Sequence, residues 1–459
     1  MARRGTPHDG TTRDGGMTGA ANGSTRQRTR DWKVRSGMGH SLAYRASHTP
    51  QPTVVTDLAT SVRPRPPSSA EATGAMIRIR SFLDDTSPPT PCLVLDLRTV
   101  RERYLQLAWA FGPTESRTGA RLCYAVKANP APEVVRLLVG LGARFDAASV
   151  PEIELCLSCG ASPDDISYGN TIKKRADIAR AHALGVHLFT SDSIDDVSAI
   201  AECAPGSSVF CRILLADTGS LTPFGAKFGC SASMAEDLLA TAARLGLRPA
   251  GVAFHVGSQQ PDPGVWDTGI ATAADITARL AARGIMLPML NVGGGLPGQY
   301  TQAVPPFASY AAAITASVCR HFDRVRLAAP RVMLEPGRCL VADAGLLRAE
   351  VVLVSRKSTV DDRRWVYLDV GRYGGLAETE QEYITYRLET PGRGGPTGPV
   401  YLAGPTCDGD DVLYQHTVYE LPMDLRQGDP VDFLSAGAYT ASYSSVAFNG
   451  FPPLVTHCI

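Results

Sequence analysis

The stretch that decides the fold is residues 122–149, "LCYAVKANPAPEVVRLLVGLGARFDAAS". A short apolar run reaching Lys127 is followed by apolar residues at helical spacing, a Leu-Gly stop, and a second short run around Asp146. This pattern predicts a strand, a helix and a second strand. Burying an unpaired lysine is costly, so Lys127 either reaches water along its stem or is a nucleophile whose pKa burial lowers.

The same alternation repeats along the chain. Short apolar runs separated by helical stretches lie at residues 122–128, 144–149, 165–170, 186–191, 209–215, 250–257, 290–295 and 331–337. Eight such units predict an α/β fold, a (β/α)8 TIM barrel, over residues 91–340. Residues 341–459 contain strands and turns without long helices, which predicts a second, all-β C-terminal domain to which residues 91–97 could add a strand.

Composition narrows the classes of function. Lys+Arg and Asp+Glu are both 45, so no global field favours nucleic acid, and no apolar run reaches the roughly 18 residues of a membrane span. Eleven scattered cysteines indicate reduced thiols and a cytoplasmic protein. The CxxC pair Cys156 and Cys159 has helical spacing and no second pair, so we expect buried helix cysteines rather than a metal or redox site. No histidine cluster requires a metal.

Residues 1–75 are rich in Arg, Gly, Ser, Thr and Pro and have little apolar periodicity. Such a segment cannot offset the entropy of ordering, so we expect a disordered leader. A mis-set translation start and a basic nucleic-acid-binding arm are the alternatives.

Polar residues concentrate at the predicted strand ends. These are Lys127, Asp146, Arg212, His255, the glycines at 293–295 and Glu335. In a barrel the carboxyl ends of the strands meet at one mouth. Glycines there can cradle phosphate with backbone N–H groups, and the guanidinium of "EPGR" suits phosphate oxygens, although each motif alone is also a common turn. Together with a lysine they indicate a phosphorylated aldehyde cofactor.

Seven motifs extend this pattern from about Pro91 to the C-terminus: "YAVKANP", "FDAAS", "FHVGS", "GGG", "EPGR", "GPTCDGDD" and "GAYTASYSSVAFNGF". In this order they resemble the fold-type III pyridoxal-phosphate decarboxylases of ornithine, lysine, arginine and diaminopimelate, and look closer to the bacterial ornithine/lysine enzymes. The resemblance implies an alanine-racemase-like barrel and pyridoxal 5′-phosphate as cofactor.

The resemblance also implies roles for individual residues. Lys127 would be the Schiff-base lysine, Glu335 the partner of the pyridine nitrogen and His255 the ring that stacks on the cofactor. The rest of the implied cofactor site is Asp146, Glu152, Arg212, Ser258, Gly293, Gly294, Gly295, Gly337, Arg338 and Tyr439. Taken alone, His255 could be a core histidine and Tyr439 a domain-interface aromatic.

In the family, the "GPTCDGDD" segment reaches into the other subunit of a homodimer. Cys407 would then return a proton to the substrate carbon, and Asp408 would bind the distal amine of a diamino acid. Lys227 and Asp411 resemble an ion pair across the interface. The alternative is a turn with a buried cysteine.

Substrate choice depends on how one segment of the second domain aligns with the family. The acids Glu378, Glu380 and Glu382 follow "DVGRYG", and Glu382 aligns nearest the family's amine-binding position, although a solvated charge run is the alternative. We expect conversion of L-ornithine to putrescine, a step of polyamine biosynthesis. L-Lysine, 2,3-diaminopropionate and diaminopimelate are alternative substrates, and an amino-acid racemase or a non-catalytic regulatory homologue are alternative functions.

Overall fold

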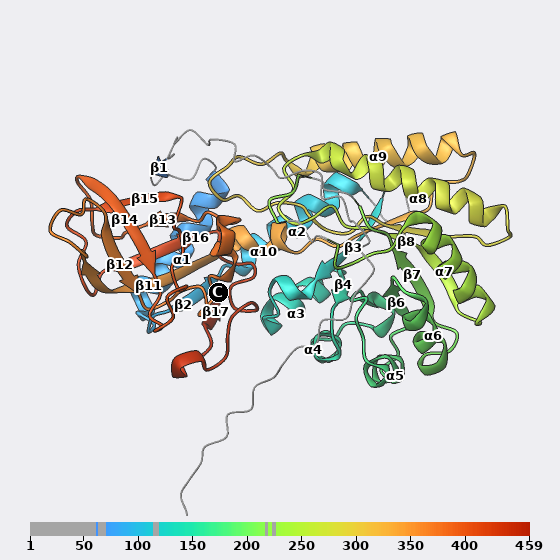
Figure 1. Ribbon diagram of the computed structural model, residues 1–459, viewed down its shortest axis with the longest axis horizontal. Coiled ribbons are helices and arrows are strands. Elements are labelled where there is room, and N and C mark those ends of the chain that lie inside the picture. Colours follow the sequence, from blue (N-terminus) through green and yellow to red (C-terminus); the bar gives the residue numbers. More distant parts are fainter. Residues whose placement is uncertain (1–60, 63–69, 113–118, 216–218, 223–225) are drawn as a thin grey trace, which may run out of the picture. The chain divides into compact units, whose positions relative to one another are not determined.

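The structure is a computed structural model, which describes residues 61–62, 70–112, 119–215, 219–222 and 226–459 (Figure 1). Most of the expected leader, residues 1–60 and 63–69, lies outside the described residues. Its expected disorder therefore remains a prediction.

Eight parallel strands close into a barrel, which confirms the predicted fold (Figure 1). In the order in which they neighbour one another, they are β10 (Arg331–Leu334), β3 (Ala120–Ala125), β4 (Arg144–Ala147), β5 (Ile166–Tyr168), β6 (Leu188–Ser191), β7 (Ser208–Arg212), β8 (Arg248–Ala253) and β9 (Met289–Asn291). Short apolar runs form these strands because both of their faces are covered.

Helices surround this barrel. They are α2 (Leu97–Phe111), α3 (Pro132–Gly140), α4 (Val150–Ser158), α5 (Arg175–Ala183), α6 (Ile194–Cys203), α7 (Ala232–Arg244), α8 (Trp266–Ala281) and α9 (Phe307–Arg324). Serine side chains cap three of them: Ser149 before α4, Ser193 before α6 and Ser231 before α7 each accept a bond from a first-turn N–H. Cys156 is buried on α4, and Cys159 follows that helix.

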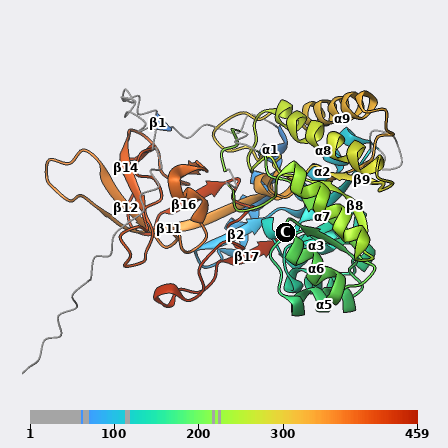
Figure 2. The ribbon, with the colours of Figure 1, turned by 45° about the vertical axis from the view of Figure 1, so that its right-hand side comes forward.

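The second domain is a nine-stranded sheet (Figure 2). Its strands are β1 (Ser61–Val62), β2 (Cys92–Leu95), β11 (Gly345–Ser355), β12 (Arg364–Leu368), β13 (Arg387–Glu389), β14 (Thr397–Ala403), β15 (Val418–Pro422), β16 (Pro430–Leu434) and β17 (Val455–Cys458). β2 precedes the barrel and pairs antiparallel with β11, with Leu95 opposite Gly345. The chain therefore leaves this sheet after β2 and returns to it as β11.

Helix α1 (Ala70–Thr86) begins inside the segment expected to be a leader. Its buried residues form a small cluster with strands of the sheet, made of Ala75, Met76, Ile79, Leu83, Cys92, Val94, Leu346 and Leu434. Arg78 adds an ion pair to Asp96 at 2.5 Å. The boundary at residue 75 is therefore corrected, because apolar contacts with residues distant in sequence order this helix.

Two features of the described residues bear on membrane insertion and on metal binding. No helix of the part of the chain that the structure describes is long and apolar enough to span a membrane. Within the same residues, no group of three or more His, Cys, Asp or Glu side chains could hold a metal ion.

Candidate active site

The polar residues predicted to meet at the barrel mouth do so. Lys127 lies in the one-turn helix η1 (Val126–Ala128) directly after β3, and Asp146 lies in β4. Arg212 ends β7, while His255 and Glu335 follow β8 and β10. Each of the five is an electrostatic neighbour of at least one other member of this group. We call these five residues the mouth group.

Lys127 pairs with a buried carboxylate. Its Nζ lies 2.7 Å from Oδ2 of Asp146, which is buried, whereas the lysine side chain is 41% exposed. Burial alone would lower the pKa of Lys127, but Asp146, Tyr439 and Glu335 raise it above its usual value. The expectation of a lowered pKa is therefore wrong for this state of the protein, because neighbouring negative charge outweighs desolvation. The amine must lose a proton before it can attack a carbonyl.

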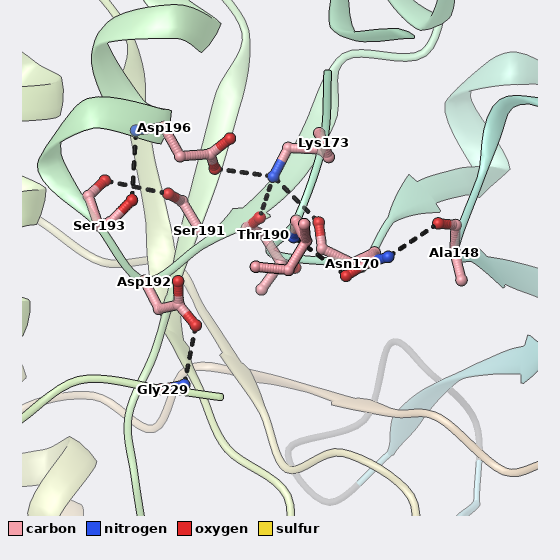
Figure 3. Close-up of polar contacts among 10 residues, drawn as sticks. Ala148, Asn170, Lys173, Thr190, Ser191, Asp192, Ser193, Asp196 and Gly229 are labelled. Carbon is pink, nitrogen blue, oxygen red and sulfur yellow. Dashed lines mark hydrogen bonds and ion pairs between the residues drawn. The ribbon is translucent and has the colours of Figure 1, made fainter. Parts of the chain in front are cut away.

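Lys173, a buried lysine of the barrel, shows what a structural lysine looks like (Figure 3). The side chain of Lys173 is fully buried, and its Nζ donates to the carbonyls of Asn170 at 3.0 Å and Thr190 at 2.8 Å and to Oδ2 of Asp196 at 2.7 Å. All three of its N–H donors are satisfied. Among the described residues Lys127 has one such partner, and its side chain is partly exposed, so its amine is not held on all sides as that of Lys173 is.

Glu335 is held by a residue that sequence reasoning did not single out. Nδ2 of Asn291 donates to Oε1 of Glu335 at 2.6 Å, and Oδ1 of Asn291 accepts from the N–H of Gly293 at 2.9 Å. Burial raises the pKa of Glu335 to about 7, and Asp146 adds to this, against the lowering effects of Lys127 and Asn291. Asn291 opens the "NVGGG" motif, and that position was the available signal.

The glycine triplet allows three loops to approach closely. A Cβ on Gly293 would lie 2.4 Å from the carbonyl oxygen of Phe254, and one on Gly294 would lie 2.4 Å from that of Glu335. A Cβ on Gly295 would lie 2.6 Å from the carbonyl oxygen of Gly257. No side chain fits at these positions, so the loop presents backbone to the barrel mouth.

His255 is neutral in this environment. Its Nδ1 accepts a hydrogen bond from the N–H of Gly257 at 3.0 Å, which leaves the ring proton on Nε2. Burial, followed by the charges of Arg212 and Lys127, holds the pKa of His255 well below its usual value. A neutral imidazole suits stacking against a ring.

Arg338 is buried and bonded on all sides. Its Nε donates to Ser258 Oγ at 3.1 Å, its Nη1 to Tyr300 Oη at 2.8 Å, and it forms a bidentate pair with Glu378 at 2.7 and 2.5 Å. The Tyr439 ring lies 4.7 Å from the guanidinium. In this state Arg338 therefore positions Ser258 and Tyr439, and Gly337 lets its loop pack on Ala125 and Ala128.

The three acids expected near the substrate amine are occupied elsewhere. Glu378 pairs with Arg338, and Glu380 lies 3.4 Å from Arg372. Both oxygens of Glu382 accept bonds from residues 415–417, including three backbone N–H groups at 2.6–2.7 Å. The structure thus gives Glu382 a turn-stabilising role and does not bring it to the mouth group.

Glu152 also has a local role. Its Oε2 accepts from the N–H of Ala148 at 2.7 Å, while its own N–H bonds to Ser149 Oγ at 3.4 Å. This reciprocal arrangement resembles a capping box at the start of α4. Glu152 therefore fixes the end of β4, which carries Asp146.

The "GPTCDGDD" residues lie on the sheet domain. Cys407 and Asp408 are exposed, and no hydrogen bond or ion pair among the described residues joins either to the mouth group. Asp411 is buried, and its carboxylate accepts from the N–H groups of Arg372 and Thr406 and from Thr406 Oγ1. Lys227 is exposed. These residues do not complete the site within one chain.

Segments of the sheet domain hold the lysine turn. The N–H of Tyr439 donates to the carbonyl of Ala128 at 2.8 Å, Nδ2 of Asn129 donates to that of Gly437 at 2.8 Å, and Ser442 Oγ donates to that of Lys127 at 2.8 Å. The position of Lys127 therefore depends on both domains.

These residues fit pyridoxal 5′-phosphate. Oδ1 of Asp146 is buried without a hydrogen-bond partner among the described residues, while Oδ2 of the same carboxylate pairs with Lys127, so the site holds an unsatisfied acceptor beside the lysine. The glycine triplet forms a cradle that a Cβ would fill, and Ser258, Arg338 and Tyr439 adjoin one another. Fold and site thus define a barrel enzyme whose mouth residues fit a pyridoxal cofactor.

Comparison with known proteins gives the family. Residues 97–342 match the pyridoxal-binding domain of the pyridoxal-dependent decarboxylases. The chain is 33% identical to a lysine/ornithine decarboxylase of Selenomonas ruminantium, over 79% of this chain and 88% of that protein. The structure of a Vibrio vulnificus lysine/ornithine decarboxylase complexed with cadaverine is similar, with 32% identity, a TM-score of 0.73, and 84% of this chain and 98% of that one covered. This chain belongs to the pyridoxal-dependent decarboxylase family.

The likeness extends to a relative with a different substrate. The arginine decarboxylase of Paramecium bursaria Chlorella virus, solved with agmatine, is 26% identical, has a TM-score of 0.74, and is matched over 83% of this chain and 100% of that one. Proteins that share this fold thus include an arginine decarboxylase as well as lysine/ornithine decarboxylases.

Proposed function

We propose that this protein decarboxylates a basic L-amino acid, and that the substrate is L-ornithine, which yields putrescine. The observation that carries the proposal is the pairing of Lys127 with Asp146 beside a carboxyl group, Glu335, whose pKa is about 7. Relatives named as ornithine decarboxylases support ornithine, including that of Schizosaccharomyces pombe, which is 33% identical over 72% of this chain and 75% of that protein.

Pyridoxal 5′-phosphate, when bound, accepts the electrons of the bond between Cα and the carboxylate. Lys127 would hold the cofactor through its amine, which Asp146 orients from 2.7 Å. Glu335, oriented by Asn291, would face the ring nitrogen, and neutral His255 would lie against the ring. Gly293, Gly294, Gly295, Ser258, Arg338 and Tyr439 would surround the phosphate.

Recognition of the distal amine would come from a second subunit. Since Glu378, Glu380 and Glu382 are engaged within their own chain, the exposed carboxylate of Asp408 is the better candidate. We propose a homodimer in which exposed Cys407 and Asp408 enter the partner's barrel mouth, Cys407 as the proton donor to Cα. Lys227 would approach Asp411 across this interface.

The test is a substrate panel with the holoenzyme. L-Ornithine, L-lysine, L-arginine, 2,3-diaminopropionate and diaminopimelate are supplied separately, and CO2 and amine products are measured. Putrescine from ornithine at the highest kcat/KM is the expected result. Faster release of cadaverine from lysine would assign the alternative substrate, and loss of optical rotation without CO2 would assign a racemase.

One relative makes a control necessary. A Xenopus laevis protein named antizyme inhibitor 2 is 32% identical over 73% of this chain, so identity alone does not establish turnover. Lys127→Ala should abolish both CO2 release and the visible absorbance of a lysine-bound pyridoxal imine. A wild-type protein that shows the absorbance but releases no CO2 from any panel member would contradict the proposal.

A further inference from the structure

Three arginines gather at the end of the barrel opposite the lysine. Arg121 is the second residue of β3, while Arg144 begins β4 and Arg331 begins β10. These strands are neighbours in the order β10, β3, β4, and they are parallel. Their amino ends therefore lie side by side, at the face away from the mouth group.

The three guanidinium groups border a hollow of about 770 Å³. The C-terminal part of α2 and the turn before β4 complete its wall, with Tyr104, Ala108, Trp109, Gly112, Leu141 and Gly142. Small-molecule sites commonly have volumes of roughly 300–1,000 Å³. The hollow thus has the size of a ligand site, and no residue of the mouth group lines it.

The charge around this hollow is unbalanced. Arg144 pairs with Asp165 at 2.7 Å. Nε of Arg121 is buried, and no described residue accepts a hydrogen bond from it; nor does any described residue form an ion pair with Arg331. Burial, followed by the charges of Arg144 and Arg331, lowers the pKa of Arg121. Among the described residues, three guanidinium groups thus border the hollow and one carboxylate pairs with them, a positive surplus that an anion would neutralise.

Interaction with helix dipoles does not account for the presence of these three arginines at the hollow. Cations near the carboxyl ends of helices are favourable, and both α2 and α3 end beside the hollow. Yet among the described residues no helix-end carbonyl accepts a bond from Arg121, Arg144 or Arg331. None of the three arginines is therefore bonded to a helix end among the described residues.

We propose that this hollow binds a small organic phosphate of about nucleotide size. Guanidinium forks match phosphate oxygens, and two guanidinium groups that have no carboxylate partner among the described residues suit a ligand with more than one negative charge. Trp109, which is 83% exposed, offers a planar face on the α2 side for a ring of the ligand.

The test uses the holoenzyme, in which the cofactor site is filled, with inorganic pyrophosphate and ADP as probes in calorimetric titrations at low salt. Arg331→Gln and Arg121→Gln should each weaken both probes by about tenfold or more, since each removes a charge-assisted hydrogen bond. Arg248→Gln is the matched control, because Arg248 also begins a barrel strand and is exposed, but does not line the hollow. It should leave both affinities unchanged.

ADP should bind more tightly than pyrophosphate and quench a tryptophan signal that Trp109→Phe removes. No binding of either probe to the wild type, or equal weakening by Arg248→Gln, would overturn the proposal. Binding of ADP no tighter than that of pyrophosphate would overturn the organic ligand in favour of an inorganic one. If Arg121→Gln does not fold, Arg331→Gln decides, because Arg331 is exposed at a strand end.

Discussion

At the scale of the residue, the surroundings of Glu335 set its chemistry. Burial and Asp146 raise its pKa to about 7, so the folded protein keeps it protonated at pH values where the unfolded chain ionises it. Stability from this group is therefore complete below the unfolded pKa and is lost as the pH rises toward about 7.

Glu335→Gln should remove this dependence in the cofactor-free protein. Between the unfolded pKa and pH 7, the melting temperature of the wild type should fall relative to that of the variant, which has no ionisable group there. The measurement is a pair of melting curves at each pH. Parallel curves across this range would show that Glu335 is already ionised in the folded state.

Sequence alone could locate Lys127, Asp146, His255 and Glu335, because each lies in or directly after a recognisable strand. It could not show that neighbouring carboxylates raise the pKa of Lys127, since that depends on distances between strands. Nor could the sequence show the hydrogen bonds of Glu382, for the same reason. The partners of Glu382, residues 415–417, are distant in sequence. The sequence around Glu382 does not indicate which turn its carboxylate stabilises.

At the scale of the element, Lys173 ties three segments of the barrel. It joins the loop after β5 to Thr190 of β6 and Asp196 of α6. Lys173→Met would leave the carboxylate of Asp196 nearly buried without its cation, at a cost of about 3 kcal/mol or more. Chemical denaturation measures this loss. Lys174→Met, at an exposed neighbour, is the control and should cost little.

Helix α1 offers a matched pair of substitutions. Ile79 is fully buried in the cluster with β2 and β11, whereas Ile77, two residues earlier, is 62% exposed. Ile79→Ala should reduce the free energy of unfolding by about 2–5 kcal/mol. Ile77→Ala should change it far less. Equal effects of the two substitutions would mean that α1 does not dock as described.

The barrel elements were predictable and α1 was not, for one physical reason. Each of the eight barrel strands has an apolar run that is enough to indicate burial. The apolar stripe of α1, Ala75, Met76, Ile79 and Leu83, is short and follows a polar segment, so its burial depends on Leu346 and Leu434 far along the chain. A local sequence pattern therefore identifies elements whose own apolar residues indicate burial. It misses an element whose burial depends on contacts with residues distant in sequence.

At the scale of the whole molecule, the proposed shared site predicts complementation. Lys127→Ala and Cys407→Ala subunits should each be nearly inactive, and a mixed dimer should contain one intact site and one doubly defective site. After random subunit exchange, activity should recover to about a quarter of the wild-type value. The decarboxylation rate of the mixture measures it.

If both residues served the same chain's site, every site in the mixture would carry one defect. Mixing would then restore nothing. Absence of recovery, with exchange verified by differently tagged subunits, would therefore rule out the shared site. Mixing Lys127→Ala with Asp146→Asn subunits is the control, because these two residues touch within one chain and should not complement.

The pairing of Leu95 with Gly345 determines which of the two domains can be produced without the other. The paired strands β2 and β11 come directly before and after the barrel in sequence. The barrel is therefore an inserted domain, the guest, and the sheet domain that it interrupts is the host. A short linker between β2 and β11 would leave the host sheet topologically complete. The guest is less independent, because the turn carrying Lys127 is fastened by backbone and side-chain groups of the host. Excision should therefore preserve the host and disable the guest.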